Sequence, residues 1–176
     1  SATSIEITKG KKKETVSAEK IILATGGRPR SFPGVELDGT RIIAYKEAMI
    51  LEKIPKKMII IGSGAIGVEF AYFYNEYGTE IHLIEMLPRI VPIEDEAVSK
   101  ELARNFKKAG IKIYTGAKVS KIDALKTKVK VHLKRKGKKE TIEGDIALVA
   151  IGVTGNIEGI GLEDIGVATD KGAIII

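Results

Sequence analysis

The sequence contains no cysteine among its 176 residues, and it has no long hydrophobic run. The absence of cysteine excludes a disulfide framework, a thiolate zinc site and cysteine redox chemistry within these residues. No apolar stretch approaches the roughly 18 residues that span a membrane, and residues 1–4 lack the basic region that begins a signal peptide. We therefore expect a cytoplasmic protein that does not cross a membrane.

The net charge of +6 and the isoelectric point of about 9.3 would permit nucleic-acid binding. The basic residues are concentrated in residues 126–139, however, where polar and apolar residues alternate over Lys128–Lys134. This alternation is typical of a half-buried strand with a solvated basic face, and Gly137 suits the hairpin turn that follows. Because no aromatic residue for base stacking is interleaved with the lysines, we expect no nucleic-acid partner.

A glycine-rich turn stands between a short apolar run and an expected helix. The run Met58–Ile61 is followed by Gly62-Ser63-Gly64-Ala65-Ile66-Gly67, which has the G-x-G-x-x-G spacing of dinucleotide-binding turns. The first glycine permits the tight turn, the second lets the backbone approach a pyrophosphate, and the third lets the helix pack closely on the sheet. The free N–H groups at the helix N-terminus would then bind the phosphates.

A second apolar run, residues 81–84, ends on Glu85, which stands 18 residues after the last glycine of the turn. In dinucleotide-binding βαβ units, an acidic residue about 20 residues beyond the turn accepts hydrogen bonds from the ribose hydroxyls. A carboxylate there would repel a 2′-phosphate, so the sequence predicts NAD rather than NADP. The alternative is a glycine-rich turn in an α/β domain that binds no ligand.

The remaining pattern predicts a Rossmann-like α/β fold in three layers, with a parallel sheet and a three-stranded β-meander. The helix after the turn is expected to end at Gly78 and to bury the residues at helical spacing, namely Ile66, Phe70, Phe73 and Tyr77. A second helix is expected over residues 94–109, with Val98, Leu102, Phe106 and Ala109 on its apolar face. Other expected elements are a hairpin over 4–24 with a buried strand at 21–24, a linker at 25–45, a short helix at 45–51, strands at 111–114 and 145–151, and the meander at 117–143.

Four segments, in this order, resemble motifs of the flavin-dependent pyridine nucleotide–disulfide oxidoreductases. They are Ala24–Pro29, Ile61–Phe70, Glu85–Arg89 and Ala150–Asn156. The resemblance covers nearly the whole chain and implies an NAD-dependent flavoprotein oxidoreductase with NAD and FAD as cofactors. It also implies that residues 45–152 are an NAD-binding domain, and that residues 1–44 and 153–176 are remnants of an FAD-binding domain.

The same resemblance implies roles for single residues. Thr25 and Gly26 would contact the flavin cofactor, and Glu69 would lie at the nicotinamide end of NAD. The backbone around Val119 would face the adenine, and Gly152 would lie near the nicotinamide ribose. One departure from the family pattern is a glycine at position 155, where the family usually has a proline.

The resemblance is strongest to members of the family that act on lipoamide. It implies lipoamide or a lipoyl-carrying protein as a partner, and a homodimer for the whole protein. The redox disulfide and the histidine–glutamate pair of the family have no counterpart in this chain, so we predict no catalytic residue and no metal site. His82 and His132 are each isolated and are interpreted as structural or exposed residues.

Two alternative functions remain compatible with the sequence. One is another flavoprotein pyridine nucleotide reductase, of the NADH oxidase or mercuric reductase type. The other is a non-catalytic module that binds NAD. The chain stops in the apolar run Ala173–Ile176, and we expect it to be a fragment of a larger protein that is inactive by itself.

Overall fold

The computed structural model describes residues 1–176 and divides them into two compact units. The larger unit contains residues 29–152, and the smaller unit combines residues 1–28 with residues 153–176. Residues 29–44, which the sequence analysis interpreted mainly as a linker, fold with the larger unit and bury Val35, Ile42 and Ile43 in it. No helix is long and apolar enough to cross a lipid bilayer.

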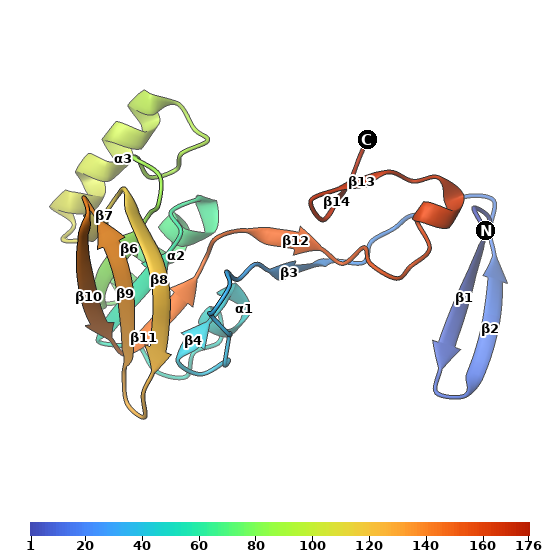
Figure 1. The fold of residues 1–176 in the computed structure, drawn as a ribbon, viewed down its shortest axis with the longest axis horizontal. Coiled ribbons are helices and arrows are strands. Elements are labelled where there is room, and N and C mark those ends of the chain that lie inside the picture. Colours follow the sequence, from blue (N-terminus) through green and yellow to red (C-terminus); the bar gives the residue numbers. More distant parts are fainter. The chain divides into compact units, whose positions relative to one another are not determined.

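The larger unit alternates strands and helices and then adds an antiparallel meander (Figure 1). Its elements, in chain order, are β4 (Ile42–Ile43), α1 (Tyr45–Ala48), β5 (Lys57–Ile61), α2 (Ala65–Glu76), β6 (Glu80–Ile84), α3 (Glu96–Lys108), β7 (Lys112–Tyr114), β8 (Ala117–Ala124), β9 (Val129–Arg135), β10 (Lys138–Gly144) and β11 (Ile146–Val149).

A five-stranded parallel sheet, in the order β4-β11-β5-β6-β7, is the middle of three layers. Successive side chains of a strand point to opposite faces, and both faces of this sheet are covered. Met58 and Ile60 of β5 pack in one apolar cluster with the helices, whereas Ile59 and Ile61 pack in a second cluster with the meander. Burial on both faces explains why β5 is apolar at nearly every position. The predicted α/β fold is confirmed.

The meander β8, β9 and β10 covers the second face of the sheet, and its strands are arranged in the order β10-β9-β8. Val129, Val131 and Leu133 of β9 are buried, as the alternating pattern predicts, whereas Lys130 and His132 between them are half-buried and Lys134 is exposed. The turn between β9 and β10 places Lys136 and Gly137 at φ of 48° and 79°, and two positive φ angles match the right-handed twist of the flanking strands.

The smaller unit consists of short two-stranded sheets. Its elements are β1 (Ser4–Lys9), β2 (Lys12–Ser17), β3 (Gly27–Pro29), which reaches the unit boundary and pairs with β12 (Val153–Gly155), the 3₁₀ helix η1 (Glu163–Ile165), β13 (Thr169–Asp170) and β14 (Ala173–Ile174). The predicted buried strand at residues 21–24 is wrong: no strand pairs with this segment, and Ile22 is 92% exposed. The ion pair between Arg28 and Glu158, with N and O 2.5 Å apart, holds the segment after β12.

The predicted apolar face of α2 is confirmed at Ile66 and Phe70, which pack against the core, and is wrong at its other two positions. Gly67, Ala71 and Tyr74 are buried, whereas Phe73 and Tyr77 are exposed. The small residues let the helix lie close to the sheet, and the aromatic residues at the next helical positions are turned toward solvent. Gly78 follows the helix at φ 85°, so the predicted end of the helix is confirmed.

The other two helices are shorter than predicted. α1 ends at Ala48 rather than at residue 51, and α3 spans Glu96–Lys108. In α3 the predicted apolar face is correct at Phe106, which is buried, and wrong at Val98, which is exposed. The side chain of Asp95 accepts a hydrogen bond from the Ala97 N–H at 2.7 Å and caps this helix.

A buried histidine on β6 contacts a tyrosine of the neighbouring strand β7 and a glutamate of its own strand. The Nδ1 of His82 lies 3.0 Å from the Tyr114 hydroxyl, and its Nε2 lies 2.9 Å from Glu80 Oε1. Burial lowers the pKa of His82, against the opposing effect of Glu80. Hydrogen bonds from Lys112 and His82 lower the pKa of Glu80 to about 2. These contacts give His82 a structural role, as predicted.

Glu80 is therefore expected to make the stability of the fold depend on pH. Its folded-state pKa is depressed from 4.5 to about 2, so its contribution is present above about pH 4.5 and is lost as the pH falls toward 2. Glu80→Gln should reduce the loss of stability on acidification, measured by urea unfolding at about pH 5 and about pH 3. The side chain is 43% exposed, so solvent screening keeps the effect small.

A suitable control is Glu101→Gln, which removes a carboxylate from an exposed ion pair with Arg104 on α3. This variant should retain the acid sensitivity of the unsubstituted protein. An equal pH dependence in the Glu80 and Glu101 variants would contradict the role assigned to Glu80.

Candidate functional site

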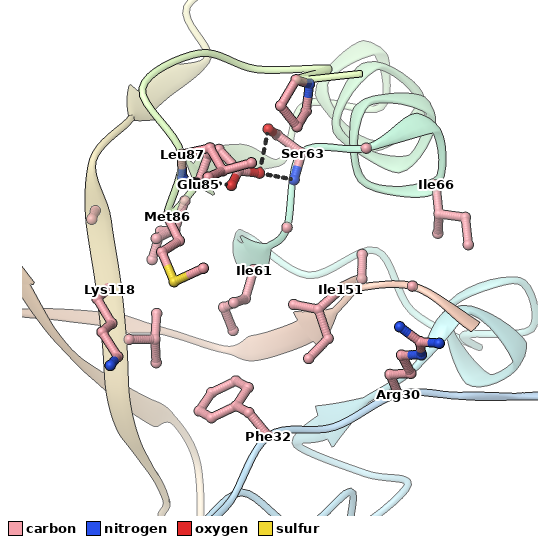
Figure 2. Close-up of a pocket in the computed structure, with 18 of the residues that line it drawn as sticks. Arg30, Phe32, Ile61, Ser63, Ile66, Glu85, Met86, Leu87, Lys118 and Ile151 are labelled. Atoms are coloured by element: carbon pink, nitrogen blue, oxygen red, sulfur yellow. Dashed lines mark hydrogen bonds between the residues drawn. The ribbon is translucent and has the colours of Figure 1, made fainter. Parts of the chain in front are cut away.

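A large cavity of about 1220 Å³ opens at the carboxyl ends of the central strands of the larger unit (Figure 2). Ile61 at the end of β5, Glu85 just after β6 and Ala150 just after β11 line it. In open parallel sheets, ligands bind outside the carboxyl ends of the strands, where the chain connections diverge to either side. The cavity thus occupies the ligand-binding position of this architecture.

The glycine turn between β5 and α2 forms one wall of the cavity. Gly62 has φ 98°, and a Cβ there would collide with the carbonyl group of Ala150. A Cβ on Gly67 would collide with the Gly62 carbonyl oxygen. Both glycines are therefore needed for the fold itself: one makes the turn, and the other lets α2 approach the end of β5.

Gly64 is different, because its backbone and its surroundings would both accept a side chain. Its φ is −69°, an ordinary value, and no atom lies within 4 Å of the position that its Cβ would take. It is the N-cap residue of α2, and no side chain caps the helix or places an acidic group in the first turn. The fold leaves open space and uncapped N–H groups at this point of the cavity wall.

Glu85 is tied to the glycine turn by hydrogen bonds, which Figure 2 shows as dashed lines. Its Oε2 accepts from the Ser63 backbone N–H at 3.0 Å and from the Ser63 hydroxyl at 2.7 Å. Its Oε1 accepts from the Leu87 N–H at 2.8 Å. The carboxylate is only 8% exposed and lines the cavity. The acid at the end of β6 is therefore held at a fixed place beside the turn.

The loop between β6 and α3 completes this arrangement. The Val91 N–H donates to the Ser63 carbonyl oxygen at 2.8 Å, and Val91 has φ 39°. A positive φ is a genuine outlier for a β-branched residue, and such strain persists only where surrounding contacts impose it. Ser63 is thus held through its N–H, its hydroxyl and its carbonyl group.

Three charged side chains line the cavity: Arg30, Glu85 and Lys118. Figure 2 shows Arg30 and Lys118 on different sides of the cavity. Phe32 lies between them in the same view and presents a ring to the interior. Two cations, one anchored carboxylate and an apolar wall suit an elongated ligand that carries both negative charge and hydroxyl groups.

The structure brings together most, but not all, of the residues predicted for the cofactor site. Those that line the cavity are Gly62, Ser63, Gly64, Ala65, Ile66, Glu85, Val119 and Gly152. Gly67 is buried on the inner side of α2, and Glu69 is exposed on that helix and does not line the cavity. Thr25 and Gly26 belong to the smaller unit.

Local sequence patterns do not indicate that the segment Arg30–Pro33, expected to be part of a linker, belongs to the site. This segment lines the cavity, and the Arg30 N–H donates to the Gly152 carbonyl at 2.9 Å. The only local signal was an aromatic residue beside a proline in a polar stretch. The segment joins the site through a contact with a residue far along the chain, which local patterns do not encode.

The family of this chain follows from comparison with known proteins. Residues 2–176 match the family described as pyridine nucleotide-disulphide oxidoreductase. The chain belongs to this family, and the resemblance inferred from its sequence motifs is confirmed.

Individual relatives show which members of the family this chain is similar to. Dihydrolipoyl dehydrogenase from Chlorobaculum tepidum is 44% identical over 160 residues, which cover 90% of this chain and 34% of the relative. The enzyme of the same name from Bacillus subtilis is 38% identical over 175 residues, covering 98% of this chain and 37% of the relative. The crystal structure of LpdA from Mycobacterium tuberculosis superposes with a TM-score of 0.83 at 28% identity, over 95% of this chain and 36% of that one. The chain spans about a third of the length of the curated relatives it matches.

The stability of the protein should respond differently to alanine substitution at Gly64 and at Gly67. Gly67→Ala should destabilise the protein by about 1–3 kcal/mol through overpacking, although alanine normally stabilises a helix interior. Gly64→Ala should cost at most about 1 kcal/mol, the effect of a weaker N-cap. Thermal unfolding of the two variants measures the difference. Equal destabilisation would show that the turn is not packed as described.

Proposed function

We propose that the larger unit binds NAD(H) in this cavity, with the pyrophosphate against the glycine turn and the N-terminus of α2. The observation that carries the proposal is Gly64. It is the one glycine of the turn that neither φ nor packing requires. A ligand phosphate that comes close to the protein backbone at this point would explain why position 64 carries no side chain.

Glu85 supports NAD over NADP. A carboxylate offers about four acceptor positions, and the protein occupies three of them. Because Glu85 lines the cavity, the remaining position would accept a ribose hydroxyl of a ligand bound there. A 2′-phosphate placed there would be repelled by the buried negative charge of Glu85, and the carboxylate has no hydrogen-bond donor to offer it. In this arrangement the chain holds the adenosine end of the cofactor and orients the rest.

The names of its relatives suggest that the whole protein is a dihydrolipoyl dehydrogenase. In such an enzyme, FAD would pass electrons from the dihydrolipoyl group to NAD, which would accept them as a hydride. We propose that residues 45–152, together with residues 29–44 that fold with them, form its NAD-binding domain. Residues 1–28 and 153–176, including Thr25 and Gly26, would belong to its FAD-binding domain. Lipoamide or a lipoyl-carrying protein would be the partner, and the whole protein would be a homodimer. Gly152, which lines the cavity, would lie toward the nicotinamide half, whereas Glu69 would reach the nicotinamide only where the cofactor extends beyond the cavity.

NADH is expected to bind more tightly than NADPH, and Gly64→Val is expected to abolish the binding of both. The branched side chain would occupy the open space that the pyrophosphate needs, while the fold loses no more than about 1 kcal/mol at the N-cap. Calorimetric titration measures affinity, and thermal unfolding verifies that the variant is folded. Gly64→Ala should weaken binding to an intermediate degree. Unchanged NADH affinity in the folded valine variant would remove the turn from the site.

The chain alone should show no dihydrolipoamide-dependent reduction of NAD. Residues 1–176 contain no cysteine, so they cannot carry the dithiol–disulfide step. The preparation should also be colourless, because it retains no bound flavin. A yellow preparation with a flavin absorbance spectrum, or measurable turnover with dihydrolipoamide, would contradict this expectation.

A further inference from the structure

We propose that Ser63 is a positioning residue that sets the preference for NAD(H) over NADP(H), and that it acts through Glu85. The inference rests on the proposed function and deepens it. Ser63 has no solvent-exposed surface, although it belongs to the cavity wall. It therefore acts on a cofactor through a neighbour rather than by direct contact.

The two residues are joined by a pair of hydrogen bonds to one oxygen. The backbone N–H and the hydroxyl of Ser63 both donate to Glu85 Oε2, at 3.0 Å and 2.7 Å. Hydrogen bonds to a charged acceptor are about twice as strong as neutral ones. Because the Leu87 N–H holds the other oxygen at 2.8 Å, both ends of the carboxylate are fixed and the side chain cannot rotate away from the cavity.

The position of Ser63 is itself fixed from the opposite side. Its carbonyl oxygen accepts the Val91 N–H at 2.8 Å, and the adjacent Gly62 N–H donates to the Ile84 carbonyl at 2.8 Å. The turn is thus connected to the end of β6 and to the loop that follows. These bonds allow the serine hydroxyl to transmit a rigid geometry to Glu85.

A fixed carboxylate discriminates between the two cofactors better than a mobile one. Repulsion of a 2′-phosphate is greatest when the negative charge cannot move away, and acceptance of a ribose hydroxyl is best when the acceptor is already in place. Without the hydroxyl, Oε2 keeps a single donor. The backbone N–H groups of residues 63 and 87 still hold the carboxylate, but less tightly. NADH then meets a less firmly placed acceptor, and NADPH meets a negative charge that can move slightly away.

The test measures the dissociation constants of NADH and NADPH for the unsubstituted chain and for Ser63→Ala. The preference for NADH should narrow by about 3- to 30-fold, which is less than the roughly 10- to 150-fold that a hydrogen bond to a charged group can contribute, because the backbone N–H still holds Oε2. Ser99→Ala is the matched control. Ser99 is also a buried serine whose hydroxyl donates at 2.7 Å, to the Ile90 carbonyl, and it does not line the cavity. In the Ser99→Ala variant, the ratio of the dissociation constants of NADPH and NADH should equal that of the unsubstituted chain.

A double substitution separates positioning from general damage. In a Glu85→Gln background, which lacks the negative charge, Ser63→Ala should leave the ratio of NADH to NADPH affinity unchanged. An unchanged ratio in the single Ser63→Ala variant, even with both affinities lowered, would overturn the inference but leave the proposed function intact. Failure of the unsubstituted chain to bind NADH at all would overturn the proposed function and this inference with it.

Discussion

The close approach of α2 to the end of β5 is the contact on which the rest of the site depends. Gly67 rests against the Gly62 carbonyl with no room for a Cβ, and Gly62 in turn lies against the backbone of Ala150. This contact aims the N-terminus of α2 along the carboxyl edge of the sheet. It also places the turn within hydrogen-bonding distance of Glu85, which follows the end of the neighbouring strand β6. A side chain at either glycine would push the helix, and with it the cavity wall, out of position.

Those parts of the fold that local patterns encode were predictable. Apolar runs marked β5, β6 and β11, alternation marked β9, and glycines marked both the turn and the helix ends. Such signals depend on steric and solvation preferences of a few neighbouring residues. The same reasoning located the glycine turn and Glu85, because their roles follow from their place at strand ends.

The parts that depend on distant contacts were not predictable in this way. Phe73 and Tyr77 have the helical spacing of a buried face, yet the requirement for close packing at Gly67 turns Ala71 inward instead. The strand-like run at residues 21–24 finds no pairing strand. The contribution of Phe32 to the cavity and the bonds between Ser63 and Glu85 exist only because the fold brings separate segments together.

The strained loop residue Val91 has a consequence for the motion of the site. A β-branched residue at positive φ costs about 1–3 kcal/mol, and the bond to the Ser63 carbonyl is one of the contacts that maintain it. When that bond breaks, the strain at Val91 is released and the glycine turn loses a partner at the same moment. We therefore expect the loop and the turn to open and close together. The amide proton of Val91, shielded from exchange with water while the segment is closed, is a built-in reporter of whether the turn is assembled in the absence of any ligand.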